Sequence, residues 1–209
     1  VAALGALAPL RESGVEVIVV DGGSSDGTVA AAISLADRVL SAPRGRASQM
    51  NAGAAEARGQ MLLFLHADTR LPPHVLALVE RALADHNWGR FDVAIEGCSK
   101  WLPVIAAMMN LRSRITGIAT GDQAIFVTRP AFEAVGRFPD QPLMEDIELS
   151  KRLKRRGPPA CLRARAATSG RRWERHGVWN TILLMWRLRF DYWRGVPAAR
   201  LAARYHPGA

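Results

Sequence analysis

The chain has 209 residues, of which 49% are hydrophobic and 22% charged, and its formal net charge is +9. This length suits one folded domain, and the balanced composition excludes a disordered, collagen-like or coiled-coil protein. Cys98 and Cys161 are too few for a disulfide framework, so we expect buried free thiols in a reducing compartment and a cytoplasmic protein.

Positive charge is concentrated near the C-terminus. Residues 1–150 hold 13 Lys+Arg and 17 Asp+Glu, a net charge of −4, whereas residues 151–209 hold 15 and 2, a net charge of +13. Such a basic segment could face phosphates, nucleic acid or an anionic membrane. No apolar run reaches the ~20 residues of a spanning helix, so the chain is not predicted to cross a membrane.

In the first ninety residues, apolar runs alternate with helix-forming stretches. Val15–Val20 and Met61–Leu65 are typical of buried strands, and Val39–Leu40 of a short one. The expected helices are Leu4–Ser13, Thr28–Asp37, Ala47–Ala57 and Pro73–Asp85. This alternation predicts an α/β protein with a mostly parallel central sheet and helices on both faces.

Beyond residue 91 the pattern is looser. We expect strands at Phe91–Glu96 and Ala124–Thr128, with the helix Leu102–Arg114 between them. Two more helices are predicted at Glu145–Arg156 and Val178–Arg194. Neither repeats nor low-complexity linkers interrupt the chain, which indicates one domain over residues 1–209.

Acidic residues follow the two longer predicted strands, with Asp21 after the first and Asp68 after the second. Ligands of open α/β sheets gather at the carboxyl ends of strands. The loop GGSSDG lacks the G-x-G-x-x-G spacing of a dinucleotide site, and the chain has no P-loop. A later acidic pair, Glu145 and Asp146, opens a predicted helix, where it either performs chemistry or only stabilises the helix dipole.

Five motifs occur in order over about residues 15–175. They are VIVVDGGSSDGT, RGRASQMNAGAAEARG, MLLFLHADTRLPP, GDQAIFV and PLMEDIELSKRLKRRG. Together they resemble the family-2 glycosyltransferases with a GT-A fold, and within them a small bacterial subgroup labelled arsenosugar-type. The resemblance implies an inverting transferase that moves a sugar from a nucleotide-diphosphate donor to a hydroxyl acceptor.

The resemblance also implies an arrangement of the chain. Residues from about 1 to 130 would bind the nucleotide sugar, and residues from about 131 to 209 would form the acceptor side with basic amphipathic helices. The first strand of the family has no counterpart in this sequence. We therefore expect an N-terminally truncated sheet with a gap in its core.

For the donor, the resemblance implies contacts from several loops. Asp21 would hydrogen-bond the base or ribose, and Asp26 belongs to the same loop or caps the next helix. Arg46 and Asn51 would lie beside the donor, where Arg46 either neutralises a phosphate or is a solvated loop arginine. Arg172 would lie over the diphosphate, with a surface basic cluster as the alternative.

His66-Ala67-Asp68 stands where the family has its Asp-x-Asp motif, whose carboxylates hold Mg²⁺ or Mn²⁺ against the diphosphate. The metal would offset the charge that builds on the leaving group. Asp68 is the expected ligand, while His66 either joins it or packs against the sugar. His176 is a further candidate ligand, or a solvated histidine.

The resemblance places the general base in the Glu-Asp pair, usually at the Asp. Asp146, or Glu145 beside it, would take the proton of the acceptor hydroxyl. Asp122 and Gln123 of the GDQ segment are expected on the acceptor side, with a tight turn as the alternative. Trp173 is expected there too, with a surface basic and aromatic cluster as its alternative.

One stripe of the predicted helix Val178–Arg194 is apolar and is flanked by arginines. Its members are Trp179, Ile182, Leu183, Trp186, Phe190 and Trp193, beside Arg187, Arg189 and Arg194. Core packing is the usual role of such a stripe. The alternative is contact with an anionic membrane at its inner face, which would suit a lipid-linked acceptor.

Two other functions fit parts of the pattern. A nucleotidyltransferase on a similar sheet would also need carboxylates and a metal. A non-catalytic binder of nucleic acid or membrane would use the basic C-terminal third, yet it has no need of Asp21, Asp68, Glu145 and Asp146. We therefore expect no nucleic-acid partner.

Overall fold

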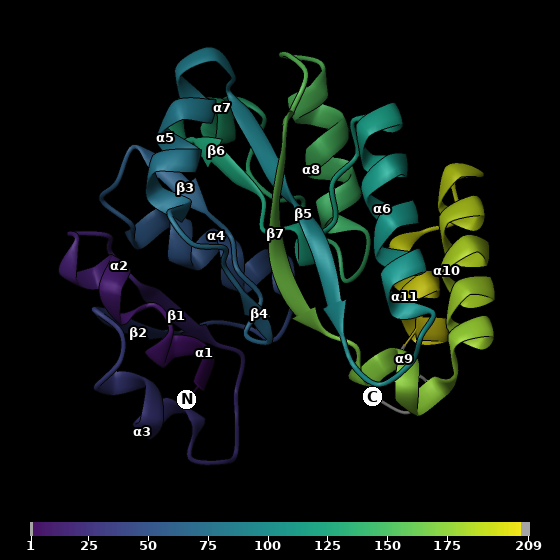
Figure 1. Cartoon of the computed structure of the whole chain (residues 1–209), viewed down its shortest axis with the longest axis horizontal. Coiled ribbons are helices and arrows are strands. Elements are labelled where there is room, and N and C mark those ends of the chain that lie inside the picture. The colour runs from purple at the N-terminus through teal and green to yellow at the C-terminus, as the bar shows by residue number, and fades with distance from the viewer. Residues whose placement is uncertain (1, 206–209) are drawn as a thin grey trace.

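The computed structural model describes residues 2–205, which form two β-sheets with helices around them (Figure 1). The smaller sheet pairs β1 (Ile18–Asp21) with β2 (Arg38–Ser41) in parallel. α3 (Thr28–Ile33) connects the two strands, and α4 (Arg46–Glu56) packs against them.

The first predicted helix is divided. In place of one helix over Leu4–Ser13, the chain forms α1 (Ala2–Gly5) and α2 (Ala8–Glu12). Pro9 lies in the first turn of α2, where its missing N–H is tolerated, but it could not continue a helix from α1.

The larger sheet has five strands in the order β3-β6-β5-β7-β4. Only β5 and β7 are parallel in it, while β3–β6, β5–β6 and β4–β7 are antiparallel. The prediction of a mostly parallel sheet is therefore wrong, because strands in this sheet pair in both directions. Its strands are β3 (Met61–Leu63), β4 (Thr69–Arg70), β5 (Trp88–Glu96), β6 (Phe126–Thr128) and β7 (Ala160–Ser169).

The mixed pairing follows from the connection between β5 and β6. Beyond β5 the chain enters α6 (Leu102–Thr116), which packs along that strand. Residues 117–125 then lead back to the sheet, so that β6 enters from the opposite end and runs antiparallel to β5.

The other elements are α5 (Val75–Asp85), the 3-10 turn η1 (Gly121–Gln123), α7 (Arg129–Ala134), α8 (Glu145–Lys154), α9 (Arg171–His176), α10 (Val178–Trp193) and α11 (Ala198–Tyr205).

Both faces of the five-stranded sheet are covered. α5 packs on one face, where Val79 lies in a cluster with Phe91 and Phe126. α8 packs on the other, where Leu149 lies with the fully buried Trp88. Burying a large apolar side chain contributes roughly 1.5–3 kcal/mol to the free energy of folding, so the packing of Leu149 in this cluster helps to hold α8 on the sheet.

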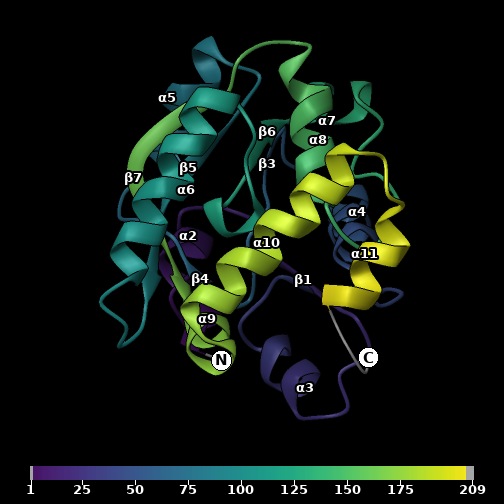
Figure 2. The ribbon, with the colours of Figure 1, turned by 90° about the vertical axis from the view of Figure 1, so that its right-hand side faces the viewer.

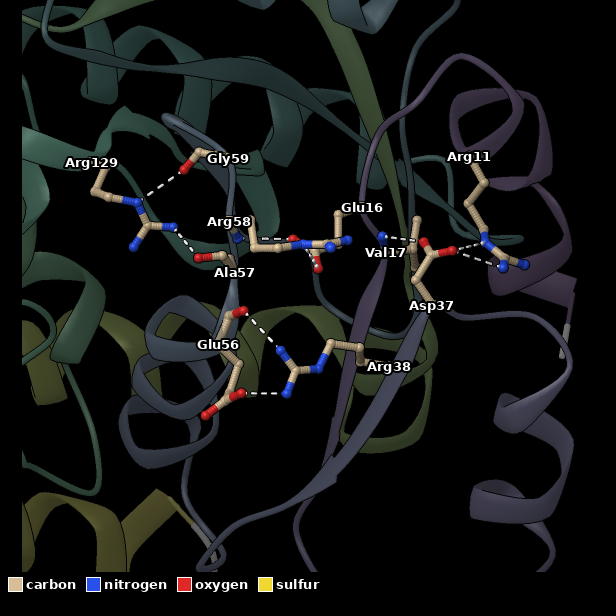
Figure 3. A network of polar contacts seen from close by, with 10 residues as sticks. All are labelled: Arg11, Glu16, Val17, Asp37, Arg38, Glu56, Ala57, Arg58, Gly59 and Arg129. Carbon is tan, nitrogen blue, oxygen red and sulfur yellow. Dashed lines mark hydrogen bonds and ion pairs between the residues drawn. The ribbon is translucent and has the colours of Figure 1, made fainter.

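Polar contacts join the smaller sheet to the rest of the molecule (Figure 3). The Asp37 carboxylate accepts hydrogen bonds from Arg11 at 2.9 Å and from the Val17 N–H at 2.8 Å. Arg129, at the start of α7, donates to the carbonyls of Ala57 at 2.6 Å and Gly59 at 2.9 Å. Further pairs join Arg58 to Glu16 and Arg38 to Glu56. The segment between α4 and β3 is thereby held on both sides.

Two smaller findings complete the fold. Cys98 is exposed in the loop that follows β5, so the expectation of a buried thiol is wrong there, while Cys161 is half-buried. Within residues 2–205, no helix combines the length and the apolar character that crossing a bilayer requires.

Candidate active site

Four regions that are distant in sequence meet at one pocket. They are α4, the loop that follows β3, the turn η1 with the residue before β6, and the start of α8 with the segment that leads into it. The pocket is lined by Met50, Phe64, His66, Gly121, Ile125, Phe138, Glu145 and Asp146. The predicted acidic pair and the predicted histidine therefore lie in one place.

The acidic pair occupies the first turn of α8. Met144, in the left-handed conformation with φ of 66°, precedes it and turns the chain into the helix. Glu145 is only 3% exposed, and Asp146 Oδ2 accepts a hydrogen bond of 2.9 Å from the Gly121 N–H. This bond ties the base candidate directly to η1.

Burial sets the acidity of this pair. Burial raises the pKa of Glu145, and the neighbouring Asp146 carboxylate raises it further. Burial also raises the pKa of Asp146, against the hydrogen bond from Gly121, which favours its charged form. A carboxylate with a raised pKa is a better proton acceptor than an exposed one, which is the property that a general base needs.

Two arginines face the pair. Arg46 begins α4, and its Nη1 lies 3.9 Å from Glu145 Oε1. Burial opposes its charge, but Tyr205, Glu145, Asp146 and Asp122 outweigh that effect and raise the pKa of Arg46.

The second cation is Arg112 on α6, which lies within electrostatic range of Asp146. Among the described residues, its Nε and Nη2 are buried without a hydrogen-bond partner. Burial lowers the pKa of Arg112, and the Asp146 carboxylate partly restores it. No motif marks Arg112 in the sequence, where it lies within the predicted helix Leu102–Arg114.

His66 and Asp122 form a contact at the rim of the pocket. His66 Nδ1 lies 3.3 Å from Asp122 Oδ1. The imidazole packs on Gly121, where an added Cβ would lie 2.2 Å from His66 Nε2. Burial would raise the pKa of Asp122, but His66, Arg46 and Arg172 outweigh it and hold that pKa below its usual value. In this arrangement the histidine faces Asp122.

Arg172 and Trp173, neighbours in α9, lie in two different environments. The Arg172 guanidinium stacks 3.7 Å above the ring of Tyr205, and its Nη2 donates to the Tyr205 carbonyl at 3.3 Å. Trp173 instead packs with Val178 and Ile182 against the apolar cluster between β5 and α6. Arg172 therefore faces the site, while Trp173 supports the fold. No motif marks Tyr205 in the sequence either, because its contact with Arg172 depends on how α11 packs.

The acidic loop after β1 is engaged with its own backbone. Asp21 accepts hydrogen bonds from the Gly23 N–H at 2.8 Å and the Ser24 N–H at 2.9 Å, and from the Ser24 hydroxyl. These bonds, the Ser24 hydroxyl first, lower the pKa of Asp21. Asp26 accepts from the Thr28 N–H at 3.0 Å, which is the helix-capping alternative that the sequence allowed.

Asn51 and Gln123 also serve the framework. Asn51 exchanges two hydrogen bonds with the backbone of Phe138, at 2.9 and 3.0 Å. Gln123 is fully buried, and its side-chain amide oxygen Oε1 accepts a hydrogen bond from the Thr120 N–H at 3.2 Å. The GDQ segment is thus the tight turn that the sequence offered as an alternative. Of its two predicted acceptor-side residues, only Asp122 has a partly exposed side chain.

The described residues contain no ready cluster of three or more His, Cys, Asp or Glu side chains that could hold a metal ion. Asp68 is 43% exposed in its turn, and its nearest charged partner is Arg171 at 3.9 Å. Mg²⁺ sites often use one or two carboxylates with substrate phosphates, which the chemistry of Asp68 fits. His176 is exposed at the end of α9.

Comparisons with known proteins agree on one family. Residues 3–140 match the family model described as glycosyl transferase family 2. No curated protein sequence shows significant similarity to the chain.

Solved structures share the fold. Staphylococcus aureus TarS (residues 1–349) is 16% identical, with a TM-score of 0.61 over 81% of this chain and 56% of that chain. The mannosyltransferase PcManGT from Pyrobaculum calidifontis, in complex with GDP-Man and Mn²⁺, is 22% identical, with a TM-score of 0.55 over 74% and 48%. TarS is also solved with UDP-GlcNAc. This chain spans about half the length of these proteins, and the similarity establishes a GT-A fold.

Proposed function

The chain belongs to glycosyl transferase family 2, and on that premise we propose that it transfers a sugar from a nucleoside-diphosphate donor to an acceptor hydroxyl with inversion. The observation that carries the proposal is the buried Glu145–Asp146 pair, bonded to η1 and faced by Arg46. The neighbours whose names include UDP-GlcNAc and GDP-Man support the donor class.

Asp146 is the proposed base. As the acceptor oxygen bonds to the anomeric carbon, the carbon–oxygen bond to the diphosphate breaks, and the hydroxyl proton passes to a carboxylate oxygen of Asp146. A single displacement of this kind inverts the anomeric configuration. The Gly121 N–H fixes one oxygen of Asp146, and burial keeps the proton affinity of its carboxylate high.

Two arginines near the acidic pair and Asp122 would hold the diphosphate of the donor. Arg46 and Arg172 carry fixed positive charge near Asp122 and the acidic pair, and a diphosphate between them would form charge-assisted hydrogen bonds. The stack of Arg172 on Tyr205 keeps its guanidinium plane in one orientation. Asp21 would accept hydrogen bonds from the nucleoside through those lone pairs of its carboxylate oxygens that its own loop leaves available.

Asp68, with His66 in the same turn, would hold a divalent ion beside the diphosphate. Such an ion would neutralise charge on the departing group. For His66 to take part, its ring would have to release Asp122. The narrower assignment to the arsenosugar-type subgroup remains a prediction from the motifs.

A thermal-shift panel tests the proposal. UDP, GDP, CDP, ADP and dTDP are each added with and without Mn²⁺ to the chain and to Asp68→Asn. We expect one nucleotide to raise Tm, more strongly with Mn²⁺, and the metal-dependent part to be lost in the variant. Exposed Asp140, changed to Asn, is the matched control. No shift with any nucleotide would contradict the proposal.

A further inference from the structure

Two helices carry a large apolar surface that the described part of the chain leaves uncovered. Ten of its twelve exposed large hydrophobic residues lie on α6, on α10 or directly before α6. Both helices lie on the side of the molecule that faces the viewer in Figure 2. Concentration on one side is what distinguishes an interaction surface from scattered surface residues.

On α10 the exposed residues form a stripe. The sequence favours core packing for this stripe, and the structure corrects that expectation, because only Ile182 packs against the core. The inner face is already filled by Leu188, which is 1% exposed, so the outer residues have no core to enter. The exposed members are Trp179, Leu183, Trp186, Phe190 and Trp193, between 55% and 77% exposed.

α6 extends the same surface. Its exposed residues recur at steps of four, three and four, which places them on one helix face. Trp101, at its start, meets Trp179 of α10 with ring centroids 5.4 Å apart, so the two stripes join where both helices begin. The α6 members are Val104, Met108, Leu111 and Ile115.

Positive charge borders this surface. Helical spacing places Arg187 and Arg194 beside the stripe of α10, and the Arg194 guanidinium lies over the Phe190 ring at 5.8 Å. Residues 151–209 as a whole have a net charge of +13. A second copy of the chain docked on this face would bring two such segments together, which like-charge repulsion opposes.

We propose that the outer faces of α6 and α10 dock on an anionic lipid bilayer, with the aromatic stripe among the headgroups and the arginines on lipid phosphates. Tryptophan and arginine are the residues that this interface favours. Anionic lipids supply the charge that the segment needs, at about 1 kcal/mol for each basic residue near the surface.

The placement connects the surface to the candidate active site. The inner face of α10 packs through Leu188 on Leu143 and Met144, which directly precede Glu145. A docked α10 would therefore hold the acidic pair close to the bilayer, where an acceptor hydroxyl on a lipid could reach it. This last step rests on the proposed function, whereas docking itself does not.

Vesicle flotation without any donor tests docking alone. Phosphatidylcholine vesicles with and without phosphatidylglycerol are mixed with the protein at low and high ionic strength. We expect flotation with the anionic vesicles at low ionic strength, weak flotation with the neutral ones, and release by salt. Absence of flotation with anionic vesicles at low ionic strength would overturn the proposal, whatever the transfer activity.

Paired variants locate the contact. Leu183→Asp with Trp186→Asp, and separately Arg187→Glu with Arg194→Glu, should each lower the partition coefficient on anionic vesicles about tenfold or more. Ile33→Asp on α3 and Arg81→Glu on α5 are exposed controls that should leave it unchanged. Circular dichroism verifies folding of each variant.

Two results would contradict this assignment. The first is equal flotation of the α10 variants and the wild type. The second is a wild-type dimer in sedimentation velocity that Leu183→Asp with Trp186→Asp converts to monomer, without vesicle binding in either form. In the second case the surface would be a subunit interface.

Discussion

Two acidic segments of this chain look alike in sequence and differ in structure. Asp21 and Asp26 accept hydrogen bonds from nearby groups, the Ser24 and Thr28 side chains first and then the backbone, and these bonds lower the pKa of each carboxyl group. Glu145 and Asp146 lie against η1 and Arg46, and burial raises the pKa of both. Folding therefore favours the charged form of the first pair and the protonated form of the second.

The contrast shows that position in a motif does not fix the chemistry of a carboxylate. Both segments follow an apolar run or open a helix, where an acidic residue is commonly structural. What separates them is the set of partners that the fold supplies.

The largest effect is expected from Asp146→Asn. This change removes the proposed base and keeps an oxygen for the Gly121 N–H, so kcat should fall about 10²- to 10⁴-fold with little change in donor KM. Initial rates with the donor that the thermal-shift panel selects will measure it. A variant that keeps more than about a tenth of the wild-type kcat would remove Asp146 from the base role.

Gly121→Ala should come next. The added Cβ would lie 2.2 Å from His66 Nε2 and would move both the imidazole and the turn that supports Asp146. We expect a loss of about 1–3 kcal/mol in the free energy of unfolding, together with reduced kcat. Urea denaturation and rate measurements check both. Gly5→Ala in α1, where nothing lies within 4 Å of the new Cβ, is the control; wild-type values for Gly121→Ala would contradict the packing described.

Asp21→Asn should affect binding and spare the chemical step. Losing a charged acceptor for the nucleoside should raise the donor dissociation constant about tenfold. Isothermal titration of the nucleoside diphosphate gives this value directly. If kcat fell as far as in Asp146→Asn while binding was unchanged, the contrast between the two acidic segments would be wrong.

Arg46→Gln should shift the pH profile. The proposed base works when deprotonated, so kcat should rise with pH through the raised pKa of the pair. Arg46 favours the charged carboxylates, and its loss should move this limb to higher pH by about one unit or less. A kcat–pH series measures it, with the neighbouring exposed Arg44→Gln as control. An unshifted limb would mean that Arg46 does not act on the pair.

The smallest effect concerns stability against pH. A raised folded-state pKa stabilises the protein only while the group is protonated, so the acidic pair costs stability as pH rises through its pKa. Asp146→Asn should therefore gain stability over the wild type as pH rises above about 4, the ordinary pKa of an aspartate. The lowered pKa of Asp21 acts in the opposite sense, and its contribution should disappear as pH falls below about 4. Denaturation at a series of pH values tests both signs.

Much of the fold follows from local patterns, and the exceptions have identifiable causes. Val15–Val20 and the helices over residues 28–56 were predicted within a few residues. β7 was not predicted, because Ala160–Ser169 contains four alanines and two arginines and has little strand propensity. Its parallel pairing with β5 overrides that propensity. β5 begins earlier than predicted because Arg90, which reads as a surface residue, is fully buried and paired with Asp92.

The candidate site divides in the same way. The motifs predicted site roles for Glu145, Asp146 and His66, because each stands in a recognisable local sequence, and the fold places all three around one pocket. Arg112 and Tyr205 reach the site only through the packing of α6 and α11, which no local pattern encodes. The roles of Asn51 and Gln123 were equally hidden, since their backbone partners depend on how the turns fold.

Product analysis tests the central claim most directly. The chain and Asp146→Asn are incubated with UDP- and GDP-sugars, and the nucleotide products are separated by ion-exchange chromatography. We predict release of the nucleoside diphosphate by the wild type and its loss in the variant. Release of pyrophosphate would indicate nucleotidyl transfer, and equal release of the diphosphate by both proteins would show that the Glu145–Asp146 pair is not where the reaction takes place.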